Sequence, residues 1–278
     1  MKRNEICKFK YRKETPVKSG FTELDKITSD WKNGELIVIA ARPSMGKSAF
    51  ALSMIKNIAV DINTPVALFS LEMSMNQLAC RFMINVSGVK NVDSSNEEEL
   101  SLLNEAEKQL DNAPIFIDDT PSLSVHELRT KAFRLVREHQ IKIIILDYLQ
   151  LMNASGMTFG NREEELSVIT RSLKALALEL NIPIIAFSQL NRVVESCEGF
   201  EGKRPQLNDL RKLGSIEQDA DMVCFIHRPD YYRIFEDGEG NDLHGMAEII
   251  VAKNRNGQIG YALLKFSPEI HRFQNIDK

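Results

Sequence analysis

Short runs of aliphatic and β-branched residues alternate with longer stretches of helical period through most of the chain. The apolar runs have the length of buried strands. Strands are expected at Leu36–Ala40, Val66–Leu71, Ile115–Ile117, Ile143–Leu146, Ile184–Phe187 and Met222–Ile226. Helices are expected at Lys47–Val60, Ser74–Val86, Glu97–Leu110, Ser124–Glu138 and Glu163–Leu180. This alternation predicts an α/β fold with a doubly wound, mostly parallel sheet covered by helices on both faces.

The pattern changes near the C-terminus. Two apolar runs, Ala247–Ala252 and Tyr261–Phe266, flank Asn256-Gly257, which is a strong signal for a hairpin turn. We therefore expect an antiparallel hairpin that extends and closes the sheet. The Gly-containing stretches Asn153–Asn161 and Cys197–Lys203 are expected to be long loops, which in a compact domain are usually functional or mobile.

Length and charge bound the organisation of the chain. Its 278 residues are 43% hydrophobic, which is enough for one large domain. Residues 1–18 carry seven Lys or Arg against two Glu and predict a basic N-terminal arm or linker before a folded domain at residues 19–278. The arm is either a solvated leader or a phosphate-binding tail. Because the net charge is -4, any contact with nucleic acid would need a local basic patch.

Cysteine spacing and hydropathy indicate the cellular compartment in which the protein is expected. The four cysteines lie far apart, without the spacing of a zinc site or of a disulfide framework. No apolar run approaches the roughly 20 residues that a membrane span needs, and the polar start lacks the apolar core of a signal peptide. We expect a cytoplasmic protein that does not associate with membranes.

The segment ARPSMGKS lies between a predicted strand and a predicted helix. A phosphate-binding loop needs small residues at its bend, a Lys that reaches the β- and γ-phosphates and a hydroxyl that holds Mg²⁺; Gly46, Lys47 and Ser48 supply them. The positive end of the helix dipole would face the phosphates. Ala41 replaces the first Gly of the general pattern, so the flanking strand and helix carry the prediction. ATP and Mg²⁺ are expected on the loop formed by Ala41, Arg42, Pro43, Ser44, Met45, Gly46, Lys47 and Ser48.

Three further polar residues follow predicted strands. Asp147 ends an aliphatic run and is expected to hold Mg²⁺ with Ser48, although an acid there can also simply cap a strand. Glu72 ends the Phe69-Ser-Leu segment and is expected to activate water; the alternative is a favourable charge at the start of the next helix. Gln189 is expected to sense the γ-phosphate, unless it is an ordinary loop residue.

Six segments occur in a fixed order: ARPSMGKS, SLEMS, IIILDYLQLM, AFSQLNR, LRKLGSIEQDAD and AKNRNGQIG. Together they resemble the C-terminal motor domain of bacterial DnaB-type replicative DNA helicases, over roughly Ser19 to Phe273, and an Ala at the first loop position is usual in that family. The resemblance implies a RecA-like P-loop NTPase that hydrolyses ATP and unwinds DNA 5′→3′ during replication. It also implies a hexameric ring with ATP between subunits and single-stranded DNA in the channel. Primase or a helicase loader would be a further partner.

The resemblance also implies roles for individual residues. Lys47 and Ser48 would bind phosphate and Mg²⁺, and the other implied roles are Glu72 as catalytic acid, Asp147 as magnesium residue and Gln189 as sensor. Lys253 and Arg255, beside the hairpin turn, would reach into the ATP site of the next subunit. A rigid hairpin that presents two cations can deliver charge in this way. Apart from the resemblance, two such cations beside a turn would more simply serve solubility.

DNA contact in such a motor is expected from loops that line the channel, here Asn153–Asn161 and Leu210–Gly214. Arg211 and Lys212 would meet phosphates, and Gly214 would let the backbone approach closely, without reading the base sequence. In the family the position aligned with Lys212 is often acidic. The loop geometry and DNA affinity of the family therefore do not carry over directly at this position.

The family also carries an N-terminal helical domain and a linker helix ahead of the motor, whereas 18 residues precede the matching segment here. The chain is expected to be either the motor portion of a longer protein or a stand-alone paralogue, and ring formation stays open. Two other functions remain: a non-helicase RecA-like ATPase of recombination or repair, and an ATP-binding module that joins another helicase ring. Strand exchange without unwinding would indicate the first, and inhibition of a partner helicase the second.

Overall fold

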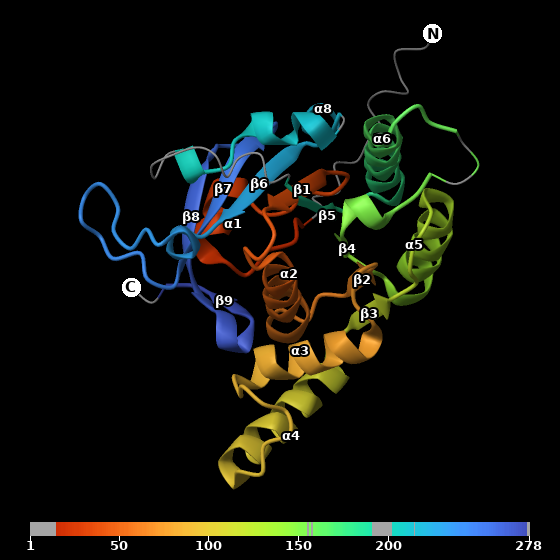
Figure 1. Cartoon of the computed structure of the whole chain (residues 1–278). Coiled ribbons are helices and arrows are strands. Elements are labelled where there is room, and N and C mark those ends of the chain that lie inside the picture. The colour runs from red at the N-terminus through yellow and green to blue at the C-terminus, as the bar shows by residue number, and fades with distance from the viewer. Residues whose placement is uncertain (1–14, 155, 157, 191–201, 214, 277–278) are drawn as a thin grey trace.

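A single sheet of nine strands forms the centre of the molecule (Figure 1). The computed structural model describes residues 15–154, 156, 158–190, 202–213 and 215–276. The strand order is β3-β2-β4-β5-β1-β6-β7-β8-β9, with parallel pairing from β3 to β6 and antiparallel pairing from β6 to β9. The strands are β1 (Leu36–Ala41), β2 (Val66–Ser70), β3 (Ile115–Asp118), β4 (Ile143–Asp147), β5 (Ile184–Gln189), β6 (Met222–His227), β7 (Met246–Asn254), β8 (Gly260–Ser267) and β9 (Arg272–Gln274).

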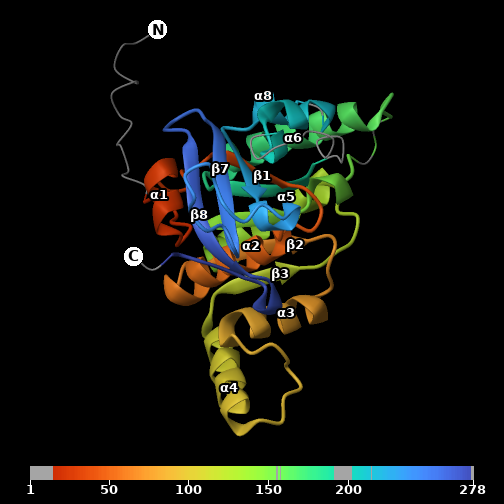
Figure 2. The ribbon, with the colours of Figure 1, turned by 60° about the vertical axis from the view of Figure 1, so that its left-hand side comes forward.

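Helices cover both faces of the sheet (Figures 1 and 2). The α-helices are α1 (Thr22–Thr28), α2 (Lys47–Ile55), α3 (Met75–Ser87), α4 (Glu97–Asn112), α5 (Val125–His139), α6 (Arg162–Leu180) and α8 (Ile216–Asp219). A π-helix, η2 (Lys56–Asp61), continues α2. The 3₁₀ helices are η3 (Leu149–Leu151), η5 (Leu207–Leu213), η6 (Pro229–Tyr232) and η7 (Pro268–Ile270). The prediction of a doubly wound, mostly parallel α/β sheet is confirmed.

Two hydrophobic cores, one on each face of the sheet, explain why β1 is apolar at every position. Successive residues of a strand point to opposite faces, so Ile37 and Ile39 enter the core beneath α1, α2 and α3. Leu36, Val38 and Ala40 enter the other core, beneath α5 and α6. Every residue of β1 is buried as a result. This is the pattern of a parallel strand covered on both sides.

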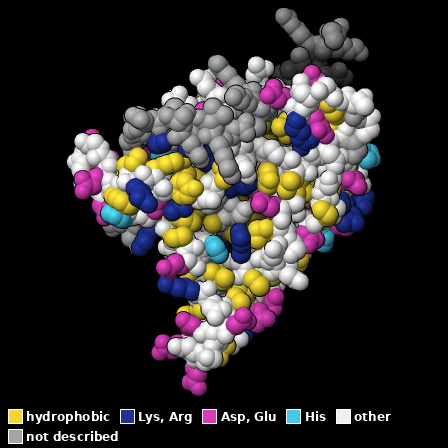
Figure 3. Space-filling model, viewed as in Figure 1, with side chains coloured by type: hydrophobic (Ala, Val, Ile, Leu, Met, Phe, Trp, Pro, Cys, Tyr) yellow, Lys and Arg dark blue, Asp and Glu magenta, His cyan; other side chains and the backbone are white. Residues whose placement is uncertain are grey.

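Local capping sets where the helices begin. Ser124 and Glu127 form a reciprocal capping box at the start of α5, and the Asn161 side chain accepts a hydrogen bond from Glu164 N–H at the start of α6. The helix α4 packs on α3 and extends away from the sheet (Figure 2). Its first turn carries Glu97, Glu98 and Glu99, and acidic side chains gather at this end of the molecule (Figure 3). Such a surface repels a phosphate backbone.

Some elements differ from the sequence-based expectations. The helix predicted at Lys47–Val60 is divided, because the chain passes from α2 into the π-helix η2. The predicted antiparallel hairpin, β7–β8, is confirmed, but it does not form the edge of the sheet, because β9 pairs with β8. α1 and β9 were not predicted. Within the described residues, no helix is both long and apolar enough to cross a membrane.

Candidate nucleotide-binding site

The carboxyl ends of four parallel strands meet at one edge of the sheet. Ala41 at the end of β1 is in register with Gln189 at the end of β5, and Ser70 at the end of β2 is in register with Asp147 at the end of β4. The predicted phosphate loop leaves the sheet at this edge and enters α2. Open α/β sheets bind ligands outside the carboxyl ends of their strands. The strand ends selected from the sequence therefore do converge.

The loop has the backbone of a phosphate-binding turn. Ser44 and Gly46 have φ angles of 66° and 91°, and Phe50 N–H donates to Gly46 O at 2.8 Å to open α2. A Cβ at Gly46 would lie 3.1 Å from the ring of Phe273 in β9. Both the positive φ and this close approach require glycine. β9 therefore supports the phosphate loop through the contact of the Phe273 ring with Gly46.

Lys47, Ser48 and Asp147 form the centre of the site. Lys47 Nζ lies 3.3 Å from Asp147 Oδ1, and Ser48 Oγ donates to Asp147 Oδ2 at 2.7 Å. The Lys47 ammonium also lies over the Tyr148 ring, 3.5 Å from its centroid. Burial lowers the pKa of Lys47, although the nearby Asp147 and Glu72 carboxylates favour its charged form. The Lys47 ammonium is thus held in place by the Asp147 carboxylate and the Tyr148 ring.

The same residues fit a magnesium ion. Ser48 Oγ and Asp147 are adjacent oxygen ligands of the kind that Mg²⁺ prefers. Asp147 Oδ1 is buried and, apart from its ion pair with Lys47, has no polar partner among the described residues. Within the described ranges no group of three or more His, Cys, Asp or Glu side chains could hold a metal ion by itself. The remaining ligands would therefore be phosphate oxygens and water.

Glu72 faces Lys47 across the cleft. Its Oε2 lies 4.0 Å from Lys47 Nζ, and its side chain is 51% exposed. The turn that contains Glu72 is fixed because Ser70 Oγ donates to Met73 O at 2.8 Å. The start of α3 has its own capping box, formed by Ser74 and Gln77. Glu72 therefore lines the same cavity as Lys47 and presents a half-exposed carboxylate to it.

Gln189 presents an exposed side chain at the end of β5. Its backbone is fixed by Gln150, whose Nε2 donates to Gln189 O at 3.1 Å and to Ser188 Oγ at 2.9 Å. Gln189 N–H donates to Gln150 Oε1 at 3.2 Å. Sequence reasoning did not single out Gln150, although it stands in the IIILDYLQLM segment three residues after Asp147.

A cavity of about 420 Å³ surrounds these groups. Arg81 from α3, Arg228 after β6 and His271 before β9 line it, and none of them was predicted. Arg228 Nη1 donates to Ser44 O at 3.4 Å, and its guanidinium lies 4.3 Å from the centroid of Phe266. Arg228 directly follows the buried strand β6. Asp147 ends β4 and Glu72 stands two residues after β2, so the same signal, a polar residue at the carboxyl end of a buried strand, could have identified Arg228.

Not every residue of the loop turns its side chain toward the cavity. Arg42 is 4% exposed, donates from Nη1 to Tyr232 Oη and lies over the Tyr232 ring. Met45 is buried in the hydrophobic core beneath α2. Both side chains anchor the loop. Arg42 nonetheless lines the cavity, whereas Met45 does not.

Lys253 and Arg255 lie at the opposite edge of the sheet from the phosphate loop, where the parallel strands begin. Because β7 runs antiparallel to β6, Lys253 is in register with Val223 near the amino end of β6. Lys253 Nζ donates to Glu217 O and Ala220 O at 2.5 and 2.7 Å. Arg255 donates to Gln218 O and lies 3.4 Å from Asp221 Oδ1. Both cations are far from the phosphate loop of their own chain and bind the carboxyl end of α8.

The predicted DNA-contacting segment is helical rather than a loop. Arg211 and Lys212 belong to the 3₁₀ helix η5, which precedes α8, while Gly214 lies outside the described residues. In the Asn153–Asn161 stretch, residues 155 and 157 also lie outside the described part. Most of Cys197–Lys203 does too. The DNA-binding assignments therefore stay predictions.

Comparison with known proteins gives consistent matches over nearly the whole chain. The family model of the DnaB-like helicase C terminal domain matches residues 16–275. The replicative DNA helicase DnaB of Geobacillus stearothermophilus is 46% identical over 269 residues, which are 95% of this chain and 57% of that protein. The replicative DNA helicase DnaC of Bacillus subtilis (strain 168) is 44% identical over 268 residues, with the same two shares. The chain thus spans little more than half the length of these relatives.

Solved structures agree with the sequence comparison. A structure described as an ATPase domain matches with a TM-score of 0.85 and 37% identity, covering 95% of this chain and 92% of that one. A DnaB-like replicative helicase, solved to describe its interactions with primase, matches with a TM-score of 0.85 and 36% identity. That match covers 95% of this chain and 62% of the other.

Proposed function

The chain belongs to the family of DnaB-like helicase C-terminal domains, and on that premise we propose that it is the ATP-hydrolysing motor of a replicative DNA helicase. It hydrolyses ATP to move along single-stranded DNA and to unwind duplex 5′→3′. One observation carries this proposal: the phosphate loop, Glu72 and Asp147 share one sheet edge, whereas Lys253 and Arg255 lie at the other. Such a site is complete only when two copies meet.

Within one chain, different residues bind the phosphates, hold Mg²⁺, activate water and respond to the γ-phosphate. Lys47 and the backbone N–H groups at the start of α2 bind the β- and γ-phosphates. Ser48 and Asp147 would hold Mg²⁺, which when bound neutralises phosphate charge. Glu72 orients and deprotonates the attacking water. Gln189 contacts the γ-phosphate region and passes its state to the segment after β5.

The neighbouring chain supplies the remaining charge. Arg255 of one copy reaches the γ-phosphate held by the next, and Lys253 accompanies it. Their distance from their own loop supports this assignment, since a cation at the amino edge of the sheet is of no use to a nucleotide at the carboxyl edge of the same chain. ATP therefore lies between subunits of a ring, for which we propose a hexamer.

The DNA-contacting elements adjoin the same two cations. η5 carries Arg211 and Lys212 and runs directly toward α8, whose carbonyl groups bind Lys253. If η5 contacts DNA phosphates, DNA binding would influence the position of α8 and, through it, of Lys253 in the β7–β8 hairpin. One structural relative is described together with its interactions with primase, which supports primase as a partner of this chain as well.

Native mass spectrometry and strand displacement test the proposed function together. With ATP, Mg²⁺ and single-stranded DNA, we expect hexamers that displace a labelled strand 5′→3′. Filaments that exchange strands without unwinding would indicate a recombination ATPase instead. Monomers that do not unwind but inhibit a related helicase would indicate an interaction module. Either of these outcomes contradicts the proposal.

Replacing Arg211 by alanine tests the DNA-contacting segment. We expect the stimulation of ATP hydrolysis by single-stranded DNA to fall and the salt dependence of DNA binding to weaken by about one phosphate contact. Hydrolysis without DNA should be unchanged. Arg137→Ala, on the exposed surface of α5, is the matched control. Unchanged DNA stimulation in Arg211→Ala would remove Arg211 from the channel.

A further inference from the structure

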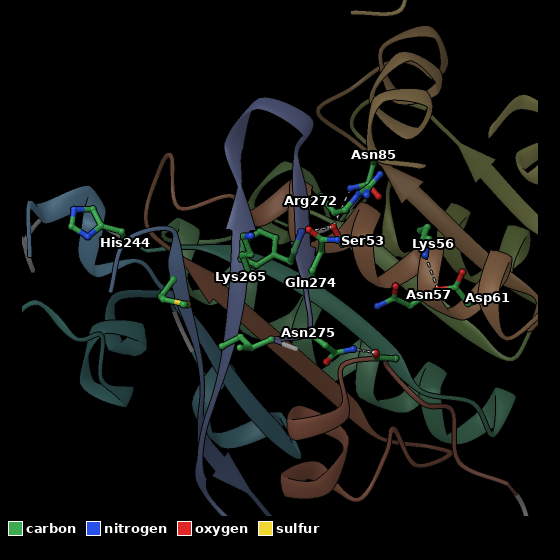
Figure 4. A pocket seen from close by; sticks show the side chains of 14 residues that line it. Ser53, Lys56, Asn57, Asp61, Asn85, His244, Lys265, Arg272, Gln274 and Asn275 are labelled. Carbon is green, nitrogen blue, oxygen red and sulfur yellow. Dashed lines mark hydrogen bonds and ion pairs between the residues drawn. The ribbon is translucent and has the colours of Figure 1, made fainter. Parts of the chain in front are cut away.

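A second cavity, of about 750 Å³, adjoins the carboxyl end of α2 and the π-helix η2 (Figure 4). Side chains from α2, η2, α3, β8 and β9 line it, and in the described part of the chain it shares no lining residue with the nucleotide cavity. Figure 4 shows its polar residues gathered between β9 and the α2–η2 segment, with His244 apart from the others. The proposed motor function makes no use of these residues.

Arg272 is the central cation of this cavity. Its Nε and Nη2 are buried, and neither has a hydrogen-bond acceptor among the described residues. Burial lowers the pKa of Arg272 because it removes water from around the guanidinium. The guanidinium nevertheless stays charged at neutral pH. A buried charge without a counter-ion is costly, and a bound anion would offset that cost.

The other charges leave the cavity positive. Lys265 is in register with Gln274, two residues after Arg272 in β9, and forms no ion pair within the described ranges. Lys56 is already bound to Asp61 at 2.8 Å, so this pair is neutral. Arg272 and Lys265 are therefore the two cations that an anionic ligand would meet.

Amide side chains form much of the remaining wall. Asn85 is fully buried and donates from Nδ2 to Ser53 Oγ and His271 O, but its Oδ1 has no donor in the described part. Gln274 also lines the cavity, as do Asn57, whose Nδ2 donates to Ser19 O, and Asn275, whose amide is bound to Gly20 O and Thr22 N–H. Amides can both donate to and accept from peptide groups. The lining thus suits an extended peptide.

The surroundings of Arg272 favour a carboxylate over a phosphate. The carboxyl end of α3 approaches it: a Cβ on the capping residue Gly88 would lie 3.4 Å from Nη2. The partial negative charge of a helix C-terminus opposes a doubly charged phosphate more strongly than a single carboxylate. The adjoining π-helix η2 is a rare element that frequently occurs at functional sites.

We propose that this cavity binds an acidic peptide segment of a partner protein, with one carboxylate paired to Arg272 and another near Lys265. Arg272 would form charge-assisted, bidentate hydrogen bonds. The bound segment would lie against β9, where Phe273 N–H donates to Ser53 Oγ at 2.9 Å and the Phe273 ring supports Gly46. A partner at this position contacts the strand beneath the phosphate loop without entering the nucleotide site.

Titration of the whole chain with labelled peptides tests the proposal. The probes are a fluorescein-labelled hexapeptide of alternating Glu and Leu, its counterpart with Gln in place of Glu, and inorganic phosphate as a competitor. Fluorescence anisotropy should show saturable binding of the Glu peptide only. Arg272→Gln should weaken this binding about tenfold or more, since hydrogen bonds to charged groups contribute about 1.5–3 kcal/mol. Arg137→Gln should leave it unchanged.

Two controls keep the test decisive. Binding of a fluorescent ATP analogue should stay at the wild-type level in Arg272→Gln, which shows that the nucleotide site is folded. Lys265→Gln alters an exposed side chain, so it should weaken the Glu peptide severalfold without affecting folding. Equal affinity of wild type and both variants for the Glu peptide would overturn the proposal. Displacement of the peptide by phosphate at similar concentration would also overturn it, because the cavity would then be a phosphate site.

Discussion

Replacing Arg255 by alanine is expected to lower the rate of ATP hydrolysis by about 10³- to 10⁵-fold, while the affinity for ATP stays close to that of the wild type. The side chain lies at the amino edge of the sheet, opposite the phosphate loop, so its loss removes nothing from the nucleotide site of its own chain. In the proposed ring, it would remove the positive charge that stabilises the transition state in the neighbouring subunit. Steady-state turnover and titration with a fluorescent ATP analogue measure the two effects separately.

A nearby cation provides the matched control. Lys32 Nζ donates to Asn256 O at the same hairpin turn, so Lys32→Ala removes a positive charge from this region without removing Arg255. It should hydrolyse ATP at nearly the wild-type rate. Mixing Arg255→Ala with Lys47→Ala gives a further test. Each variant alone should be inactive. In a mixed ring, some intact phosphate loops of Arg255→Ala subunits would face intact Arg255 side chains of Lys47→Ala subunits, so part of the activity should return. Absence of recovery in mixed rings would contradict action between subunits.

Replacing Glu72 by glutamine is expected to preserve nucleotide binding and to lower turnover by about 10²- to 10⁴-fold, the usual contribution of a general base. Glutamine keeps the shape of the side chain but cannot accept a proton. Glu72 is half exposed and 4.0 Å from Lys47, so loss of its charge should alter the phosphate contacts little. Single-turnover hydrolysis separates the chemical step from product release.

Glu98→Gln is the control for Glu72, because it removes a carboxylate from the exposed first turn of α4. Its turnover should equal that of the wild type. Asp147→Asn gives a useful contrast, since it should impair the effect of Mg²⁺ as well as turnover. Normal hydrolysis by Glu72→Gln would remove Glu72 from the catalytic role and leave it as a solvated charge beside Lys47.

The central sheet could be predicted from the sequence because its strands are buried on both faces. Ile143–Leu146 has no polar residue, and such a run is typical of an inner parallel strand. α5 was predictable because Ser124 and Glu127 mark its first turn. α1 and β9 are short, and tertiary contacts stabilise them: Phe21 of the segment before α1 stacks on Phe50, and Ser53 holds the backbone of β9. Contacts between segments so far apart leave no local pattern.

In the candidate site, too, residues at the ends of parallel strands could be predicted from the sequence, and residues placed by distant contacts could not. Asp147 and Gln189 were identified because each ends a buried parallel strand, and parallel ends share an edge. His271 enters the cavity through β9, whose position no periodicity indicates. The separation of Arg255 from its own phosphate loop depends on the antiparallel register of β6 and β7, which the residue pattern alone did not give.

The contact between β9 and the phosphate loop also bears on how the protein is made. Ser53 and Phe273, which join α2 to β9, are separated by 220 residues. A ribosome delivers the loop early, and the ring that supports Gly46 emerges only after all eight other strands have been synthesised. A chain with such distant pairings acquires its final contacts late in folding. The capacity to bind nucleotide would thus mature as one of the last events of biosynthesis, when the sheet that carries it is already assembled.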